Sequence, residues 1–163
     1  MKRLLGRLAG ALAATLALTS QACPIGHAHY RYSAGQSSAD ISVVPQLKGQ
    51  PFALAFHLNL AGKRDLWFLF DQGSSRDVSL ISVTDPRAPG WSPPDPNGRR
   101  PMHDQRFIAW NDDLKIHDLS PQAGASAPKF VLVPDLAETM RYGGSGERMM
   151  IGSGIFKLSN CAP

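Results

Sequence analysis

The chain has 163 residues, with 17 lysines and arginines against 13 aspartates and glutamates, and hydrophobic residues make up 43% of it. This length fits one domain with a core of its own. Three of the basic residues, Lys2, Arg3 and Arg7, precede an uncharged stretch rich in alanine and leucine at 8–18, and without residues 1–22 the formal net charge falls from +4 to +1. A nearly neutral remainder excludes nucleic acid and anionic membrane surfaces as expected partners.

Residues 1–22 have the layout of a cleavable export signal. The basic head is followed by an apolar stretch of a signal peptide's length, too short for a permanent transmembrane helix. Ser20, Gln21 and Ala22 then form the small, any, small pattern that precedes a cleavage site. We expect cleavage after Ala22, a single domain over residues 23–163, no transmembrane anchor, and a destination in the periplasm or outside the cell.

The sequence contains two cysteines, Cys23 and Cys161, close to the two ends of the expected mature chain. In an oxidising compartment they are expected to form a disulfide, which stabilises by about 5 kcal/mol in the chain-entropy model. The alternative is a bacterial lipoprotein with its lipid anchor on Cys23. Ser20 occupies the position where lipoprotein signals usually have leucine, and lipidation would leave Cys161 unpaired, so the sequence favours the disulfide.

His27 and His29 lie two residues apart just after Cys23. In an extended segment both side chains point to the same face, where two imidazoles could share a copper or zinc ion. Two ligands do not complete a metal site, and residues 27–32 also fit an ordinary strand with Ala28 and Tyr30 facing the core. A periplasmic copper- or zinc-binding protein is therefore one alternative function, whereas the main interpretation requires no cofactor.

Alternation of apolar and other residues predicts strands. Leu54, Phe56 and Leu58 alternate with Ala55 and His57, which is typical of a strand with one buried face. The strands expected from such runs, bounded by Gly, Pro, Ser and Asp, are 40–47, 52–60, 66–70, 78–83, 107–110, 130–133 and 149–158. The continuously apolar run at 66–70 indicates a central strand.

Helix is expected only at residues 134–142, because Pro134 stands at the start of this segment and Gly143 follows it. Many short strands with turn residues between them indicate a sandwich or a barrel. We therefore expect an all-β fold, a single immunoglobulin-like β-sandwich of about seven strands with a long Pro-rich loop and at most one short helix.

Residues 68–75, Phe-Leu-Phe-Asp-Gln-Gly-Ser-Ser, resemble the active-site turn of pepsin-like and retropepsin-like aspartic proteases. Those enzymes place two apolar residues before Asp, then Thr or Ser, then Gly, so that carboxylates from two turns share one proton. The resemblance implies a peptidase in which Asp71 and Gly73 act in a homodimer. Gln72 stands where the family has its hydroxyl residue, and residues of this kind also suit a hairpin turn.

The connection from Asp85 to Gln105 contains six prolines, which exclude a central strand and favour stiff, extended backbone. Two interpretations are open: Trp91 covers the end of the sandwich, or the loop binds a partner with Trp91 as anchor and Arg99 and Arg100 as polar rim. The main hypothesis is an exported, non-enzymatic binding protein of the inhibitor, immunity or accessory type that acts on a protein partner in the bacterial envelope. This hypothesis rests on analogy of size and architecture.

Overall fold

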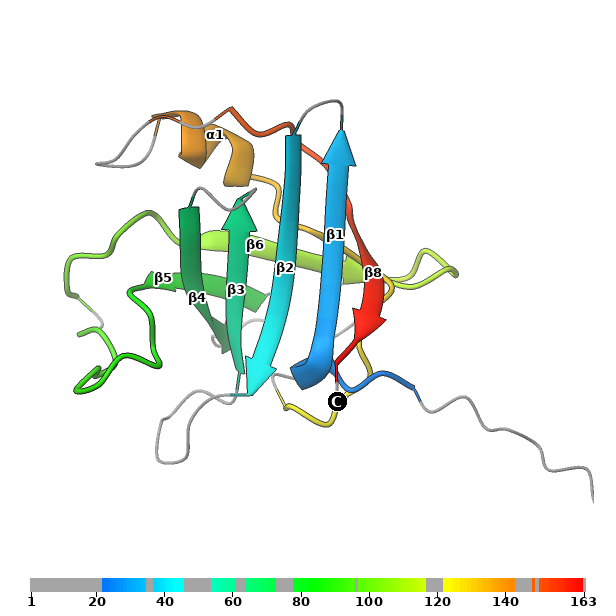
Figure 1. Cartoon of the computed structure of the whole chain (residues 1–163), viewed down its shortest axis with the longest axis horizontal. Helices are drawn as coiled ribbons and strands as arrows, with labels where there is room; N and C mark the ends of the chain where they lie inside the picture. The colour runs from blue at the N-terminus through cyan, green and yellow to red at the C-terminus, as the bar shows by residue number, and fades with distance from the viewer. Residues whose placement is uncertain are drawn as a thin grey trace, which may run out of the picture.

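The structure, a computed structural model, describes residues 22–34, 37–45, 54–60, 64–72, 78–95, 97–116, 122–142, 148 and 150–162. Its elements in chain order are η1 (Ile25–His27), β1 (Ala28–Ala34), β2 (Ser37–Pro45), β3 (Leu54–Leu60), β4 (Arg64–Gln72), β5 (Val78–Val83), β6 (Gln105–Trp110), β7 (Phe130–Leu132), α1 (Leu136–Tyr142) and β8 (Phe156–Cys161). Each strand pairs antiparallel with the next one along the chain, and β1 also pairs with β8, so that the strands close into a barrel (Figure 1). The all-β prediction and the prediction of one short α-helix are confirmed within the described residues.

The closed barrel replaces the immunoglobulin-like sandwich of about seven strands that the sequence predicts. Both architectures have strands with alternating inward and outward residues, so the sequence pattern does not separate them. The pairing does, because an immunoglobulin-type sandwich divides its strands between two sheets, whereas here every strand lies beside its sequence neighbours. The additional strand is β1. It lies in the segment that the sequence analysis interpreted either as an ordinary strand or as part of a metal site.

The last strand begins later than predicted. The sequence pattern predicts a strand over residues 149–158, but β8 starts at Phe156 and the described residues 150–155 are irregular, while residue 149 lies outside the description. A Cβ atom at Gly154 would overlap the ring of Tyr32, so the backbone at this residue passes close to that ring. Only glycine allows this approach, and a glycine inside a run of apolar residues weakens a strand.

Large side chains fill the interior of the barrel. Phe56 of β3 makes edge-to-face contacts with Phe68 and Phe70 of β4 and with Phe107 of β6, at centroid distances of 5.8, 6.0 and 6.1 Å. The Tyr30 hydroxyl donates a hydrogen bond of 3.0 Å to the Pro128 carbonyl inside this core. A packed interior of this kind positions any binding site on the outside of the barrel or at its rims.

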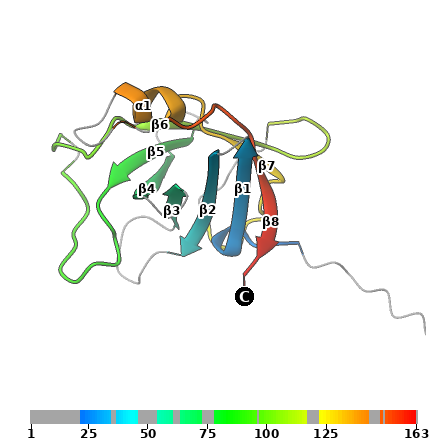
Figure 2. The ribbon, with the colours of Figure 1, turned by 45° about the horizontal axis from the view of Figure 1, so that its top comes forward.

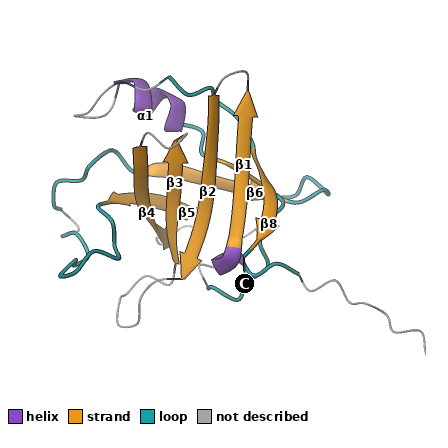
Figure 3. Cartoon of the chain, viewed as in Figure 1, coloured by secondary structure: helices purple, strands orange, loops and turns teal. Residues whose placement is uncertain are grey.

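The two helical elements lie at opposite ends of the barrel (Figure 3). α1 lies next to β6 when the top of the molecule is turned forward (Figure 2), and it contributes Leu136 and Met140 to the interior core. η1 contributes Ile25, which is fully buried, to the same core at the other end. Apolar side chains from both elements therefore extend the core beyond the strands.

A second group of buried apolar side chains lies on the outside of the wall formed by β3, β4 and β5. This outer-wall cluster consists of Ala55, Trp67, Leu69, Ile81 and Val83. Its members alternate along each strand with residues of the interior core, so these three strands are buried on both faces. The predicted central strand at 66–70 owes its continuous apolar sequence to this double burial.

Candidate functional site

The outer-wall cluster is covered by the connection between β5 and β6, residues 84–104, which we call the β5–β6 loop. The loop extends from the side of the barrel beside β4 and β5 (Figure 1). Half-buried Trp91 packs against the outer-wall cluster, and its backbone N–H donates to the Ala88 carbonyl at 3.1 Å. Trp91 thus holds the first half of the loop against the barrel wall.

A second attachment lies four residues before Trp91. The Arg87 guanidinium lies 4.2 Å from the centroid of the Trp67 ring, a cation–π contact. The same guanidinium bonds to both oxygens of Asp85, at 3.1 and 3.2 Å, and the Arg87 N–H donates to that carboxylate at 2.9 Å. These bonds from Arg87 lower the pKa of Asp85 below its usual range.

The returning end of the loop is fixed from inside the barrel. Met102 is buried in the interior core, and Ser82 of β5 bonds to both of its backbone groups. The Ser82 hydroxyl donates to the Met102 carbonyl at 2.6 Å and accepts from its N–H at 2.9 Å. Between the two fixed ends, Asp95 closes a turn by accepting from the N–H groups of Asn97 and Gly98. The loop is therefore held at both ends and braced by a turn between them.

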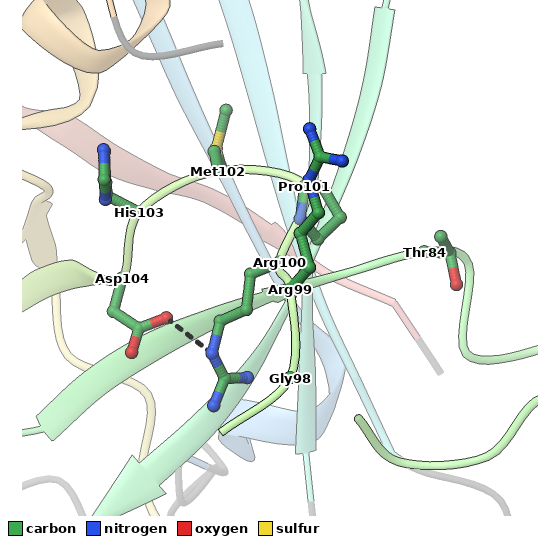
Figure 4. A pocket seen from close by; sticks show the side chains of 8 residues that line it. All are labelled: Thr84, Gly98, Arg99, Arg100, Pro101, Met102, His103 and Asp104. Carbon is green, nitrogen blue, oxygen red and sulfur yellow. Dashed lines mark ion pairs between the residues drawn. The ribbon is translucent and has the colours of Figure 1, made fainter. Parts of the chain in front are cut away.

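A cleft of about 840 Å³ opens along the second half of the loop (Figure 4). Its lining consists of Thr84, Gly98, Arg99, Arg100, Pro101, Met102, His103 and Asp104. Arg99 and Arg100 leave the backbone in opposite directions, and Arg100 turns toward Asp104 (Figure 4). The Arg100 Nε lies 3.5 Å from the Asp104 Oδ1, and the Arg100 side chain is only 18% exposed.

Arg99 differs from its neighbour. It is exposed, and within the described part of the chain it forms no ion pair. His103, which also lines the cleft, is exposed as well. The lining thus carries two guanidinium groups, one imidazole and one carboxylate, and an anionic group entering the cleft meets an exposed, charged hydrogen-bond donor.

The predicted partner-binding residues fall in two places. Trp91, the predicted anchor, lies on the barrel wall, whereas Arg99 and Arg100 line the cleft. Thr84, His103 and Asp104 also line the cleft, and none of them was predicted to bind a partner. Asp104 has a sequence signal in its spacing of four from Arg100, but Thr84 joins the cleft only because Ser82 binds Met102, a contact between residues 20 positions apart.

The predicted metal ligands are separated by their secondary structure. His27 lies in η1 and His29 in β1, so the extended spacing that would place both on one face does not apply to His27. The His29 Nδ1 lies 3.0 Å from the Ser42 hydroxyl. Among the described residues, no three histidine, cysteine, aspartate or glutamate side chains gather into a metal-binding group. A metal site on His27 and His29 stays a prediction.

The residues that resemble an aspartic protease turn lie in and after β4. Asp71 belongs to the strand itself, opposite Ser79 of β5, and is half-buried. It alternates with Phe70, a member of the interior core, and so faces the outside of the barrel. Gly73 lies outside the described residues. The homodimeric peptidase stays a prediction.

The predicted disulfide is confirmed, since Cys23 and Cys161 are bonded to each other with their Cα atoms 5.7 Å apart. This bond joins residues 138 positions apart and fixes the start of the domain to the end of β8. Residues 1–21, most of the predicted export signal, lie outside the description. Among the helices that the structure describes, none has the length and apolar character needed to cross a membrane.

Comparison with known proteins gives no relatives. No protein-family model matches the chain, and neither a curated protein nor a solved structure matches it.

Proposed function

We propose that this chain is an exported, non-enzymatic binding protein of the inhibitor, immunity or accessory type, and that it engages a protein partner in the bacterial envelope through the β5–β6 loop. The observation that carries this proposal is the way the loop is built. It is attached to the barrel through Trp91, Arg87 and Met102, yet it leaves Arg99 exposed at the edge of a cleft.

Attachment of this kind favours binding. A mobile loop loses conformational entropy when a partner orders it, at about 0.5–1.5 kcal/mol for each immobilised side chain. The β5–β6 loop avoids part of this cost because Trp91 and Met102 are already packed against the barrel. The loop therefore resembles the rigid binding loops that rigid scaffolds present to their partners.

The proposal assigns separate roles to the predicted residues. Trp91 is a positioning residue that keeps the loop against the outer-wall cluster. Arg99 takes its place as the central residue that contacts the partner. Arg100 is a further positioning residue, because its side chain is only 18% exposed and lines the cleft next to Arg99 in the chain. Charge reversal at exposed Arg99 should therefore abolish partner binding without loss of stability.

Partner capture tests this assignment. The mature oxidised protein is immobilised, incubated with envelope extract of the source organism and treated with an amine-reactive cross-linker. The same cross-linked species should form with wild type and with the control Arg148→Glu, whose arginine is exposed and lies outside the cleft lining. Arg99→Glu should reduce it at least about tenfold, a loss of about 1.4 kcal/mol. Equal capture by Arg99→Glu and wild type would overturn Arg99 as the central contact, and equal capture by Trp91→Ala as well would overturn the proposed binding surface.

Export has its own measurement. The intact mass of the protein from its native host should correspond to a chain that starts at Cys23 and should rise by about 2 Da on reduction. A chain that retains residues 1–22 would contradict export through a cleaved signal. A mass increase of diacylglycerol size on Cys23 would replace the soluble binding protein with a lipid-anchored one.

A further inference from the structure

The structure supports a more specific statement about the partner, which rests on the proposed function. We infer that the cleft beside Arg99 receives a carboxylate from an acidic segment of the partner protein, and that Asp104 occupies part of this site in the free protein.

The two arginines lie on rigid backbone. Arg100 precedes Pro101, and a residue before proline is restricted to extended conformations. Pro101 in turn precedes Met102, whose backbone and side chain are both fixed by the barrel. The guanidinium of Arg99 is therefore carried by a backbone that needs little ordering when a ligand binds, and an arginine held in this way can form two parallel hydrogen bonds with a carboxylate.

Asp104 shows that this cleft accepts a carboxylate. Its Oδ1 lies 3.5 Å from the Arg100 Nε, longer than a good hydrogen bond, and its side chain is 48% exposed. Solvent screens an ion pair of this kind strongly. A carboxylate of the partner can therefore bind Arg99 while Asp104 remains paired with Arg100. The negative charge of Asp104 repels this incoming carboxylate and weakens its binding.

The size and charge of the cleft favour an acidic protein segment over a small anion. A volume of about 840 Å³ is several times that of a phosphate ion and is in the range of sites that hold drug-sized ligands. Gly98 and Pro101, on either side of the two arginines in the chain, add uncharged lining to the cleft, which suits the aliphatic part of a glutamate side chain. A dense cluster of lysines and arginines, as expected for a phosphate-rich surface, is not what the lining contains.

Fluorescence anisotropy with a labelled Ala-Glu-Glu-Ala-Glu peptide tests the inference directly. The oxidised mature protein should bind this probe saturably and more weakly at high salt. Arg99→Gln should weaken binding at least about tenfold. Asp104→Asn should strengthen it about threefold, because it removes the opposing charge while keeping the side chain's size. Asp113→Asn is the matched control for Asp104→Asn, since Asp113 is exposed and lies outside the cleft lining.

Two further experiments test whether the cleft prefers another anionic ligand over a carboxylate. Inorganic phosphate that displaces the peptide at micromolar concentration would overturn the inference in favour of a phosphate site, and protein that sediments with phosphatidylglycerol vesicles would overturn it in favour of lipid headgroups. Absence of saturable peptide binding up to about 1 mM, a free energy of about −4 kcal/mol, would overturn it as well. A thermal melt of each variant, expected to match wild type, shows that the changes act on binding.

The outcome is distinguishable from failure of the proposed function. If the envelope partner is lost with Trp91→Ala but bound equally by Arg99→Gln, Asp104→Asn and wild type, the loop is the binding surface and the carboxylate inference is wrong. If no loop variant changes partner capture, the proposed function itself fails.

Discussion

The two apolar clusters of this protein share the strands β3, β4 and β5 but differ in how they are covered. The interior core is enclosed by the barrel itself, because every strand turns alternate side chains inward. The outer-wall cluster lies on the convex side of the same strands, where closure of the barrel offers no cover. Leu69 is nevertheless 0% exposed. The β5–β6 loop is therefore part of the packed structure as well as the candidate binding surface, and Trp91 links the two roles.

Phe56→Ala should give the largest loss of stability, because it removes the ring at the centre of the interior core. Phe56 is 1% exposed and contacts three other phenylalanine rings. We expect a loss of about 3–5 kcal/mol in the free energy of unfolding. Urea denaturation followed by circular dichroism measures it, with Phe56→Leu as the control that keeps most of the volume. A loss below about 1 kcal/mol would show that the interior is less tightly packed than the ring contacts indicate.

Gly154→Ala should disturb the edge of the interior core where Tyr32 and Phe156 meet, with ring centroids 5.6 Å apart. The added methyl group would overlap the Tyr32 ring, so either the ring or the segment must move. We expect a cost of about 1–3 kcal/mol. A double-mutant cycle with Tyr32→Ala checks the cause, because the alanine at 154 should cost much less once the ring is absent. Equal costs in both backgrounds would contradict the overlap.

The sequence predicted the strands better than their arrangement. Alternation at 54–60 identified which residues of β3 face the core, and residues 78–83 match β5 in full. Closure of the barrel depends on β1 pairing with β8, residues about 130 positions apart, and no local pattern encodes such a contact. The sequence therefore predicts the strands but does not separate a barrel from a sandwich, and the predicted sandwich is not confirmed.

The candidate site was predictable to a similar degree. Two adjacent arginines in a Pro-rich connection indicated a contact surface, and both line the cleft. One of the two interpretations gave Trp91 a packing role at the end of the sandwich, whereas it packs on the outer wall of the barrel. That place could not be predicted from the loop, because the pattern that makes it necessary lies in β3, β4 and β5. Apolar residues at 67, 69, 81 and 83 leave an outer wall that needs cover, and the nearest aromatic residue of the loop supplies it.

Trp91→Ala should cost less than either interior change, because the side chain is only half-buried against the outer wall. We expect a loss of about 1–2 kcal/mol, together with local release of the loop. Limited trypsin digestion detects this release as faster cleavage after Arg87, whose side chain lies on Trp67 in the intact structure. Trp91→Phe is the matched control and should be cleaved nearly as slowly as wild type. Unchanged cleavage in Trp91→Ala would mean that other contacts hold the loop.

The smallest expected effects are changes in the pH dependence of stability, to which Tyr30 inside the barrel and Asp85 on the loop contribute at opposite ends of the pH range. Burial raises the pKa of Tyr30 in the interior, so its contribution to stability is complete below the unfolded pKa of about 10 and is lost as the pH rises beyond it. On the loop, hydrogen bonds from Arg87 lower the pKa of Asp85, so its contribution is present above the unfolded pKa of about 4 and is lost as the pH falls through the folded value.

The alkaline limb of a stability-against-pH curve reports on Tyr30 in the interior. The acid limb contains the contribution of Asp85 together with those of Asp65 and Asp135, whose pKa values are also lowered by hydrogen bonds from their partners. Tyr30→Phe should cost about 1 kcal/mol at neutral pH, because the Pro128 carbonyl loses its donor, and should flatten the fall above pH 10. Asp85→Asn should leave the loss of stability at alkaline pH unchanged and should reduce the loss of stability at acid pH. Urea midpoints measured between about pH 2.5 and 11 test both variants. If Tyr30→Phe altered only the acid limb, the tyrosine would not be the buried interior group that the barrel requires, since a buried phenol opposes ionisation only at alkaline pH.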